Sequence, residues 1–395
     1  MKNILIASYD LEIGGVERSL LSMLEHFDYG NYNVDLMLYR HQGDFMPMLS
    51  NKVHLLNEIP EYATFRKSIG TLLKEKNYVI ATSRILAKLQ ADLIGKIKRF
   101  SEPGYYQMQL MWKYAMPFLP KVKKEYDVAI SYLWPHNFVA EKVNAKVKIA
   151  WIHTDFSAIE TDVEADSIIW SNFNHIIAVS EMCKISFVKK YPNLKHKVKV
   201  IENINSAELI RKMSLEQIEN PLLIDQKIKI VTVARLSYAK GLDIAINAMR
   251  ILKKRGYKNI VWYVVGYGGE ERALLELINK NNLLDSFILL GKRINPYPLI
   301  KAADIYVQPS RYEGKAVTVT EALILEKPIL LTNYDTADSQ IVDGYEGLIC
   351  EKSDIGIADG LESLLKGEKT KELISNISKN NYNNEDEIEK LYQLF

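Results

Sequence analysis

The chain has 395 residues, 48% of them hydrophobic and 25% charged, with a formal net charge of +2. This length is too great for one ordinary core and suits two domains of roughly 150–200 residues each. The near-neutral charge gives no indication of a nucleic-acid partner. The two cysteines, Cys183 and Cys350, are too few for a disulfide framework and lack metal-ligand spacing.

The first half of the chain alternates short runs rich in Ile and Val with helix-length amphipathic segments. Its opening residues, MKNILIASYD, predict a β-strand and not a signal peptide. No run of about 18 uninterrupted apolar residues occurs, so the sequence predicts no spanning helix and a cytoplasmic protein. The strands predicted in this half are residues 3–8, 34–38, 53–55, 128–132, 148–153 and 175–179.

A glycine pair, Gly14 and Gly15, follows the first predicted strand and precedes VERSLLSMLEHF, which predicts a helix. Paired glycines let the backbone approach a ligand closely, and a helix N-terminus offers free N–H groups to an anion. A flexible turn without a ligand explains the pair equally well.

Residues 66–124 are strongly basic, with 13 Lys and Arg against three acids, a net charge of +10. Within them, residues 84–100 place apolar and basic side chains on different helical faces, namely Ile85, Leu89, Leu93, Ile97 and Phe100 against Arg84, Lys88, Lys96 and Arg99. With Tyr105, Tyr106, Trp112 and Met116 nearby, this composition is typical of a helix in an anionic membrane surface. A core-facing helix with a solvated basic side fits the pattern equally well.

One histidine, His153, ends the predicted strand at 148–153 and is followed by Thr154 and Asp155. Ligands of parallel sheets bind outside the carboxyl ends of the strands, so this position favours a site residue. A purely structural histidine is the alternative.

The second half repeats the alternation after a polar segment, 201–226, that contains Asn203, Asn205, Asn220 and Pro221. Its predicted strands are 227–233, 260–265, 287–290, 305–308, 328–331 and 347–350. Alternation of this kind predicts parallel sheets covered by helices on both faces. The sequence therefore predicts two doubly wound, Rossmann-like α/β domains that face each other across a cleft. Their predicted bounds are 1–205, joined by a C-terminal helix at 385–395, and 206–384.

Two cations, Arg235 and Lys240, lie in the loop that leaves the first strand of the second domain. A diphosphate leaving group gains negative charge as a glycosidic bond breaks, and two fixed cations would stabilise it in the transition state. Two solvated loop cations are the alternative.

A glycine loop, Gly266-Tyr267-Gly268-Gly269, follows the second strand of this domain. It is similar to a dinucleotide fingerprint, but Glu271 replaces the third glycine, and the first strand of the domain would be the expected place for it. The loop predicts a tight turn near a nucleotide and argues against an NAD-dependent oxidoreductase.

The most specific motif is PSRYEGKAVTVTEA, which begins at Pro309. Glu313 belongs to its loop, whereas Glu321 lies about one turn into the following helix and could accept hydrogen bonds from a ribose diol. Near the helix start, the N–H groups of Ala316, Val317 and Thr318 suit a phosphate.

These motifs together resemble the retaining family-4 glycosyltransferases of the GT-B fold, of the type that builds bacterial capsule, teichoic acid or exopolysaccharide. The resemblance spans nearly the whole chain and is closer in the second half. It implies that Gly14 and Gly15 approach the donor diphosphate, that Arg235 and Lys240 bind it, and that His153 lies beside the donor sugar. It also implies a sugar contact for Glu313, a ribose contact for Glu321, and recognition of the base near Arg293, after the turn at Gly291.

The sequence departs from that family after Gly314, where Lys315 and Ala316 replace the Phe-Gly often found there. The donor is therefore open between a UDP-sugar, which we favour, and a GDP-sugar. The predicted enzyme is a retaining hexosyltransferase with a glycan or lipid-linked acceptor. No Asp-x-Asp pair is present to hold Mg²⁺, and we predict no cofactor and no metal requirement. A non-catalytic partner or glycan-binding subunit of the same fold and a nucleotide-sugar epimerase are the competing interpretations.

Overall fold

A computed structural model describes residues 1–100 and 103–395, and Glu102, one of the acids in the basic segment, lies outside the described residues. Contacts between residues divide the chain into two compact units. Unit 1 comprises Met1–Glu12, Val16–Glu202 and Asp386–Phe395, and unit 2 comprises Ile13–Gly15 and Asn203–Glu385. Among the described residues, no helix is both long and apolar enough to cross a bilayer.

Unit 1 is built on a parallel sheet whose seven described strands have the order β3-β2-β1-β4-β5-β6-β7. Its first strands are largely buried runs of aliphatic side chains, as expected for a parallel sheet covered on both faces. The strands are β1 (Lys2–Ser8), β2 (Tyr32–Leu38), β3 (His54–Leu55), β4 (Glu125–Ser131), β5 (Asn144–Ile152), β6 (His175–Ala178) and β7 (Val198–Val200). The sequence prediction found the first six and missed β7, a three-residue edge strand with an exposed Lys199 at its centre.

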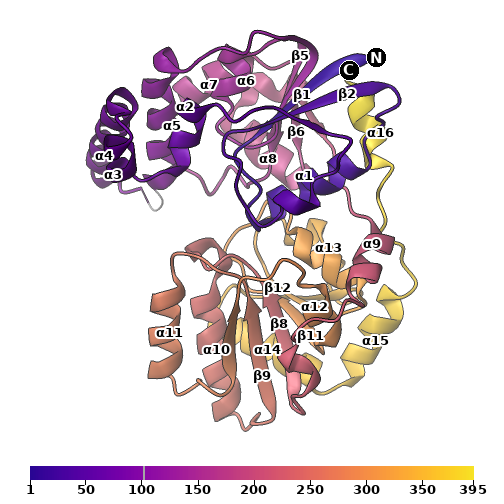
Figure 1. The fold of residues 1–395 in the computed structure, drawn as a ribbon. Coiled ribbons are helices and arrows are strands. Elements are labelled where there is room, and N and C mark those ends of the chain that lie inside the picture. The colour runs from indigo at the N-terminus through magenta and orange to yellow at the C-terminus, as the bar shows by residue number, and fades with distance from the viewer. Residues whose placement is uncertain (101–102) are drawn as a thin grey trace. The chain divides into compact units, whose positions relative to one another are not determined.

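The helices of unit 1 connect these strands as parallel pairing requires (Figure 1). Several begin at a side-chain cap: the Ser180 hydroxyl, for example, accepts a hydrogen bond from the Cys183 N–H, 3.1 Å away, at the start of α8. The helices are α1 (Gly15–Glu25), α2 (Pro60–Ala63), α3 (Ile69–Lys74), α4 (Tyr78–Lys98), α5 (Pro103–Ala115), α6 (Asn137–Lys142), α7 (Val163–Ser171), α8 (Glu181–Lys190) and α16 (Glu387–Tyr392).

The C-terminal helix α16 packs on the start of β2 and on the turn before it, close to the opposite end of the sequence. The Tyr392 ring stacks on Tyr32 at 5.0 Å, and its hydroxyl accepts a hydrogen bond from the Asp28 N–H at 2.7 Å. The helix is shorter than the predicted 385–395.

Unit 2 holds the second parallel sheet, whose six described strands have the order β10-β9-β8-β11-β12-β13. Its strands are β8 (Ile228–Val233), β9 (Ile260–Val265), β10 (Phe287–Gly291), β11 (Ile305–Gln308), β12 (Ile329–Thr332) and β13 (Gly347–Cys350). All six agree with the predicted strands to within a residue at each end. Its helices are α9 (Ala207–Met213), α10 (Leu242–Lys254), α11 (Glu271–Lys280), α12 (Tyr297–Ala302), α13 (Val317–Ile324), α14 (Asp354–Leu365) and α15 (Glu368–Ile377).

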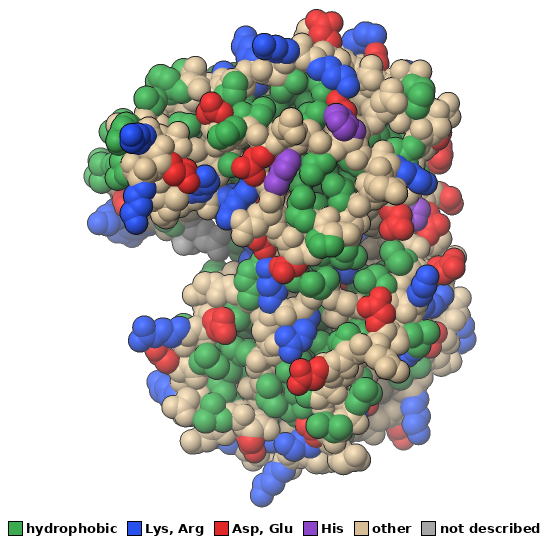
Figure 2. All heavy atoms as spheres, viewed as in Figure 1, with side chains coloured by type: hydrophobic (Ala, Val, Ile, Leu, Met, Phe, Trp, Pro, Cys, Tyr) green, Lys and Arg blue, Asp and Glu red, His purple; other side chains and the backbone are tan. Residues whose placement is uncertain are grey.

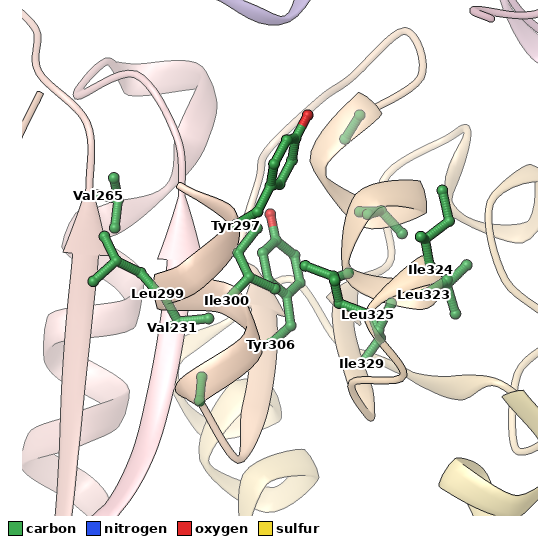
Figure 3. Packing of buried hydrophobic residues seen from close by; sticks show 14 of the residues in the cluster. Val231, Val265, Tyr297, Leu299, Ile300, Tyr306, Leu323, Ile324, Leu325 and Ile329 are labelled. Carbon is green, nitrogen blue, oxygen red and sulfur yellow. The ribbon is translucent and has the colours of Figure 1, made fainter. Parts of the chain in front are cut away.

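The polar segment at 201–226 is not a plain linker. It contains α9, whose start is capped by the Ser206 hydroxyl, and Ala207 and Ile210 from this helix are buried in the unit 2 core. Figure 3 shows part of that core, where α12 and α13 pack side chains such as Leu299, Ile300 and Leu323 beside the sheet.

Three of the four side chains predicted to accompany the amphipathic helix are core residues, whereas Tyr105 is half-buried. Trp112 is fully buried, stacks on Phe65 at 4.2 Å and donates its Nε1–H to the Tyr9 hydroxyl at 2.6 Å. Tyr106 and Met116 are buried as well. The expectation that they accompany a membrane-binding helix is therefore wrong for these three side chains.

Candidate functional site

The loops that carry the motifs of unit 2 leave neighbouring strands of one sheet. β8 and β11 pair side by side, with Tyr306 opposite Val231, although other strands separate them in sequence. The chain runs from β8 toward β9 on one side and from β11 toward β12 on the other, so the strand order reverses here. Ligands of open α/β sheets bind outside the carboxyl ends of the strands at such a point. Arg235 and Lys240 follow β8, and Glu313 follows β11.

Lys240 and Glu313 form an ion pair at this point. The Lys240 Nζ lies 2.5 Å from Glu313 Oε1, and the two side chains are only 23% and 9% exposed. The same carboxylate oxygen accepts hydrogen bonds from the Ser310 hydroxyl at 2.7 Å and the Gln308 amide at 3.1 Å. Three donors thus fix one oxygen of Glu313, and charge-assisted bonds of this kind are short and strong. The structure brings these two predicted site residues together.

Gln308, which the sequence analysis missed, connects the site to the core. Its amide oxygen accepts hydrogen bonds from the Tyr306 hydroxyl at 2.7 Å and the Thr318 hydroxyl at 3.4 Å. Its amide nitrogen donates hydrogen bonds to Ser310 and Glu313. The signal was a polar residue closing the otherwise apolar buried strand IYVQ. A buried amide whose hydrogen bonds are satisfied fixes the orientation of its neighbours.

Glu321 lies on α13, as predicted, and is almost completely buried. Its Oε1 accepts a hydrogen bond from the Tyr297 hydroxyl on α12, 2.8 Å away. Figure 3 shows the hydroxyl groups of Tyr297 and Tyr306 pointing the same way from the apolar cluster. The Tyr297 hydroxyl bonds Glu321 directly, whereas the Tyr306 hydroxyl is linked to Glu313 only through Gln308.

The first turn of α13 begins at Val317, with Ala316 as the capping residue. The first N–H groups of any helix lack partners within the helix, which is why they suit an anion. The Ala316 N–H differs from this expectation, because it donates to the Gln340 side-chain oxygen at 3.1 Å. A phosphate could use this amide only if the Gln340 side chain turned away.

Two glycines are required by the packing of these loops. Gly241, directly before α10, has a φ of +62°, and a Cβ there would lie 2.0 Å from the Pro309 carbonyl oxygen. Gly266, directly after β9, has a φ of +151°, and a Cβ would lie 1.9 Å from the Ala234 carbonyl oxygen. Glycine is needed at both positions because a larger residue would separate the loops that follow β8, β9 and β11.

The remaining predicted cations lie at the surface of these loops. Arg235 is exposed, and Lys315 and Arg293 are partly buried. Arg293 donates to the Lys292 carbonyl oxygen, and the Lys292 ammonium lies over the Tyr267 ring at 4.6 Å. Gly314, beside Lys315, is buried.

A second ion pair, which the sequence analysis did not predict, holds the motif loop in place. Arg311 donates two hydrogen bonds to Asp243, at 2.8 and 2.6 Å, and lies over the Tyr238 ring at 4.1 Å. Burial raises the pKa of Asp243, but the hydrogen bonds and charge of Arg311 outweigh it and leave the pKa below its usual value. Arg311 therefore ties the motif loop to the first turn of α10.

In unit 1, the strand order reverses between β1 and β4. Gly14 and Gly15, which contacts assign to unit 2, follow β1 in the sequence, and Gly15 is the first residue of α1. His153 directly follows β5 and packs its ring on Tyr132 at 4.7 Å. Burial lowers its pKa to about 3, so the imidazole is neutral at physiological pH.

A second histidine, His136, lies in the same region and was not predicted. It is fully buried beside Trp170, its Nδ1 lies 2.8 Å from the Ser131 hydroxyl, and burial lowers its pKa to about 3. In residues 1–100 and 103–395, the Nε2 atoms of His136 and His153 have no hydrogen-bond partner.

Within the described parts of the chain, no three His, Cys, Asp or Glu side chains are grouped so that they could hold a metal ion. Independence from metal stays a prediction.

Comparison with known proteins finds a family similar to most of unit 2. Residues 214–384 match the family called glycosyl transferases group 1. This segment of the chain is therefore similar to a group 1 glycosyltransferase domain.

Curated relatives of this chain include the capsular polysaccharide biosynthesis glycosyltransferase CapM of Staphylococcus aureus. It is 26% identical over 238 residues, which are 56% of this chain and 61% of that protein. An uncharacterised glycosyltransferase of Methanocaldococcus jannaschii, MJ1059, is 28% identical over 169 residues, 42% of this chain and 41% of that protein. The matches thus span less than two thirds of either relative.

Among solved structures, HepE of Anabaena in complex with UDP-glucose is similar over the full length of both chains, with a TM-score of 0.69 and 16% identity. This likeness confirms the predicted GT-B fold class, two Rossmann-like α/β units.

Proposed function

We propose that this protein is a glycosyltransferase that moves a sugar from a nucleotide-sugar donor to a hydroxyl of a glycan or a lipid-linked acceptor. The observation that carries the proposal is the Lys240–Glu313 pair, held by Ser310 and Gln308 where the strand order reverses in a group 1 domain. Nucleotides bind outside the carboxyl ends of parallel strands at such a point. The site supplies both a cation and a carboxylate there.

In the proposed reaction, the bond between the sugar C1 and the diphosphate oxygen breaks, and the diphosphate keeps the electron pair. The acceptor oxygen forms the new bond to C1 from the face that the diphosphate leaves, so the configuration is retained, and the acceptor proton goes to the departing phosphate. Lys240, Arg235 and the N–H groups of Val317 and Thr318 stabilise the negative charge. Glu313 contacts the sugar and Glu321 the ribose.

The other proposed contacts complete the donor site. The backbone at Gly14, Gly15, Gly266, Gly314 and Ala316 approaches the donor, residues near Arg293 contact the base, and Lys315 lies beside the sugar or acceptor. Neutral His153 lies beside the donor sugar and, with its low pKa, is no source of positive charge at neutral pH. Because side-chain cations neutralise the leaving group, we propose activity without a divalent metal, and chelation by EDTA should leave turnover unchanged.

We favour a UDP-sugar as the donor, since HepE, of the same fold, binds UDP-glucose. Relatives such as CapM take part in capsular polysaccharide biosynthesis, which supports a cell-surface glycan as the product. Thermal shifts with UDP and with GDP distinguish the two bases: a larger rise in melting temperature with GDP would overturn the preference.

The decisive experiment compares turnover of a panel of nucleotide sugars by the wild type and by Lys240→Ala. Loss of a fixed charge at the leaving group should lower turnover about 100-fold. Lys254→Ala, at an exposed lysine near the end of α10, is the matched control and should keep wild-type turnover. Unchanged turnover in Lys240→Ala would exclude the leaving-group role. A wild type that binds no nucleotide by calorimetry would instead indicate a non-catalytic subunit, and conversion of a free nucleotide sugar without acceptor would indicate an epimerase.

A further inference from the structure

The long helix α4 (Tyr78–Lys98) packs through its small side chains. Its buried residues are Ile80, Ala81, Ser83, Ala87, Ala91 and Gly95, so Ala, Ser and Gly form most of the inward face. This face lies on α5, and a Cβ on Gly95 would lie only 3.2 Å from the Pro103 Cβ. The small inward residues explain how the two helices approach so closely.

Five large aliphatic side chains of α4 point the other way. Ile85, Leu86, Leu89, Leu93 and Ile97, which we call the α4 stripe, are between 38% and 72% exposed. The sequence pattern alone allowed these residues to be the core-facing side of the helix, and the structure excludes that alternative. Single exposed apolar side chains are ordinary, whereas a continuous row marks an interaction surface. At a helical rise of about 1.5 Å per residue, the stripe is about 18 Å long.

The surroundings of the stripe are positively charged. Residues 69–99 contain seven Lys and Arg against the two acids Glu75 and Asp92. Six of these cations are exposed: Lys74, Lys76, Lys88, Lys96, Lys98 and Arg99. Figure 2 shows hydrophobic and basic side chains mixed over α4, at the left edge of the view. Arg84 is the exception, because its guanidinium donates to the Thr64 and Lys67 carbonyl oxygens and lies partly buried.

We propose that the α4 stripe docks on the surface of an anionic lipid bilayer, with the helix axis parallel to the membrane plane. A bilayer surface supplies an apolar layer for the aliphatic row and anionic headgroups for the flanking cations at adjacent depths. Long Lys side chains can keep their ammonium groups among the headgroups while their methylenes line the apolar layer. A second copy of this chain fits less well, because self-association through the stripe would bring two basic surfaces together.

This surface lies wholly within unit 1 and is independent of the transferase chemistry proposed above. If both proposals hold, docking would bring the enzyme to an acceptor that is itself embedded in a membrane.

The test is co-sedimentation of the full chain with vesicles of phosphatidylcholine, with and without phosphatidylglycerol. The wild type should bind the anionic vesicles at least about tenfold more tightly than the neutral ones, and added salt should weaken this binding. Leu89→Gln combined with Leu93→Gln should bind the anionic vesicles about tenfold more weakly than the wild type does, since the double variant removes two aliphatic side chains from the interface. Both side chains are 61% exposed, so the double variant should keep the wild-type melting temperature.

The matched control is Leu275→Gln combined with Leu284→Gln, two exposed leucines of unit 2, which should bind vesicles like the wild type. The proposal would be overturned if the wild type did not bind anionic vesicles. It would also be overturned if the Leu89→Gln, Leu93→Gln variant, the stripe variant, bound them as tightly as the wild type. A dimer in sedimentation velocity that the stripe variant abolishes would overturn it as well, because the stripe would then be an interface between copies. Donor hydrolysis in the absence of lipid should be the same in wild type and stripe variant, so this test and that of the transferase activity can fail separately.

Discussion

The carboxyl edge of each sheet, by which we mean the ends of the strands where the loops described above begin, differs between the two units. The difference lies in how the polar side chains there are paired. At the unit 2 edge, Lys240, Glu313, Ser310 and Gln308 bind one another and form a connected polar network. At the unit 1 edge, His136 and His153 pack against aromatic rings and are held neutral by burial. The difference indicates that the unit 2 network presents a cation and a carboxylate, whereas these two histidines of unit 1 present no charge at neutral pH.

Forcing apart the loops at the unit 2 edge should cause the largest loss of stability and of nucleotide binding. Gly266→Ala would place a methyl group 1.9 Å from the Ala234 carbonyl oxygen, in a backbone conformation that disfavours side chains. We expect a loss of about 3 kcal/mol of unfolding free energy or more, or about 10 °C in melting temperature, together with weaker nucleotide binding.

The matched control is Gly269→Ala in the same loop, where a Cβ meets nothing within 4 Å. It should melt within a degree or two of the wild type, as neutral surface substitutions do. Equal melting temperatures for the two variants would mean that the loops can separate without cost.

Removing the negative charge of the unit 2 network should have the next largest effect. Glu313→Gln keeps the shape of the side chain but leaves Lys240 without its carboxylate, and we expect donor turnover to fall about 100-fold. Steady-state kinetics with the preferred nucleotide sugar measures it. Glu276→Gln, at a carboxylate 67% exposed on α11, should retain wild-type turnover. Full activity in Glu313→Gln would reduce the network to a structural role.

The two edges also differ in what could be predicted from sequence. In unit 2, the strands and the placement of Lys240, Glu313 and Glu321 followed from aliphatic runs ended by glycines and charges. What periodicity could not give was the pairing of side chains: the Lys240–Glu313 contact joins loops 73 residues apart. The hydrogen bond from Ala316 to Gln340 was equally hidden, because it depends on where a distant side chain points.

In unit 1, the pattern of α4 was found but its direction was not. An amphipathic sequence gives two faces, and which one turns inward depends on the neighbouring helix. Here the residues Ala87, Ala91 and Gly95 face α5, because small side chains allow the closer contact. The buried positions of Trp112 and Tyr106 were missed for the same reason.

A smaller change tests whether the unit 2 network extends to Glu321, the proposed ribose contact. Tyr297→Phe removes the hydroxyl that donates to Glu321 and leaves the ring in the core. We expect about fivefold weaker nucleotide binding, the equivalent of about 1 kcal/mol, because Glu321 loses a partner that orients it. Isothermal titration calorimetry with UDP measures it. The Tyr306→Phe variant, which acts on Gln308 instead, should lower turnover more than it lowers nucleotide affinity. Equal affinities for wild type and Tyr297→Phe would separate Glu321 from this network.

The smallest effect concerns the neutral histidines of unit 1 and is a dependence of stability on pH. His136 has a pKa of about 3 in the folded protein and about 6.5 when unfolded, so between these values the unfolded chain binds more protons. Stability therefore falls as pH drops below about 6.5, and His136 alone should account for about 1 kcal/mol between pH 7.5 and 5.5. Urea unfolding followed by tryptophan fluorescence reports mainly on unit 1, which holds Trp112, Trp134, Trp151 and Trp170.

The informative quantity is the change in stability with pH, since His136→Asn also alters packing against Trp170. That variant should lose about 1 kcal/mol less than the wild type over the same pH interval, because Asn does not titrate. The control His196→Asn, at an exposed histidine, should keep the wild-type dependence. If His136→Asn and the wild type lost equal stability on acidification, His136 would not be held neutral by burial, and the contrast between neutral histidines in unit 1 and an ion pair in unit 2 would rest on His153 alone.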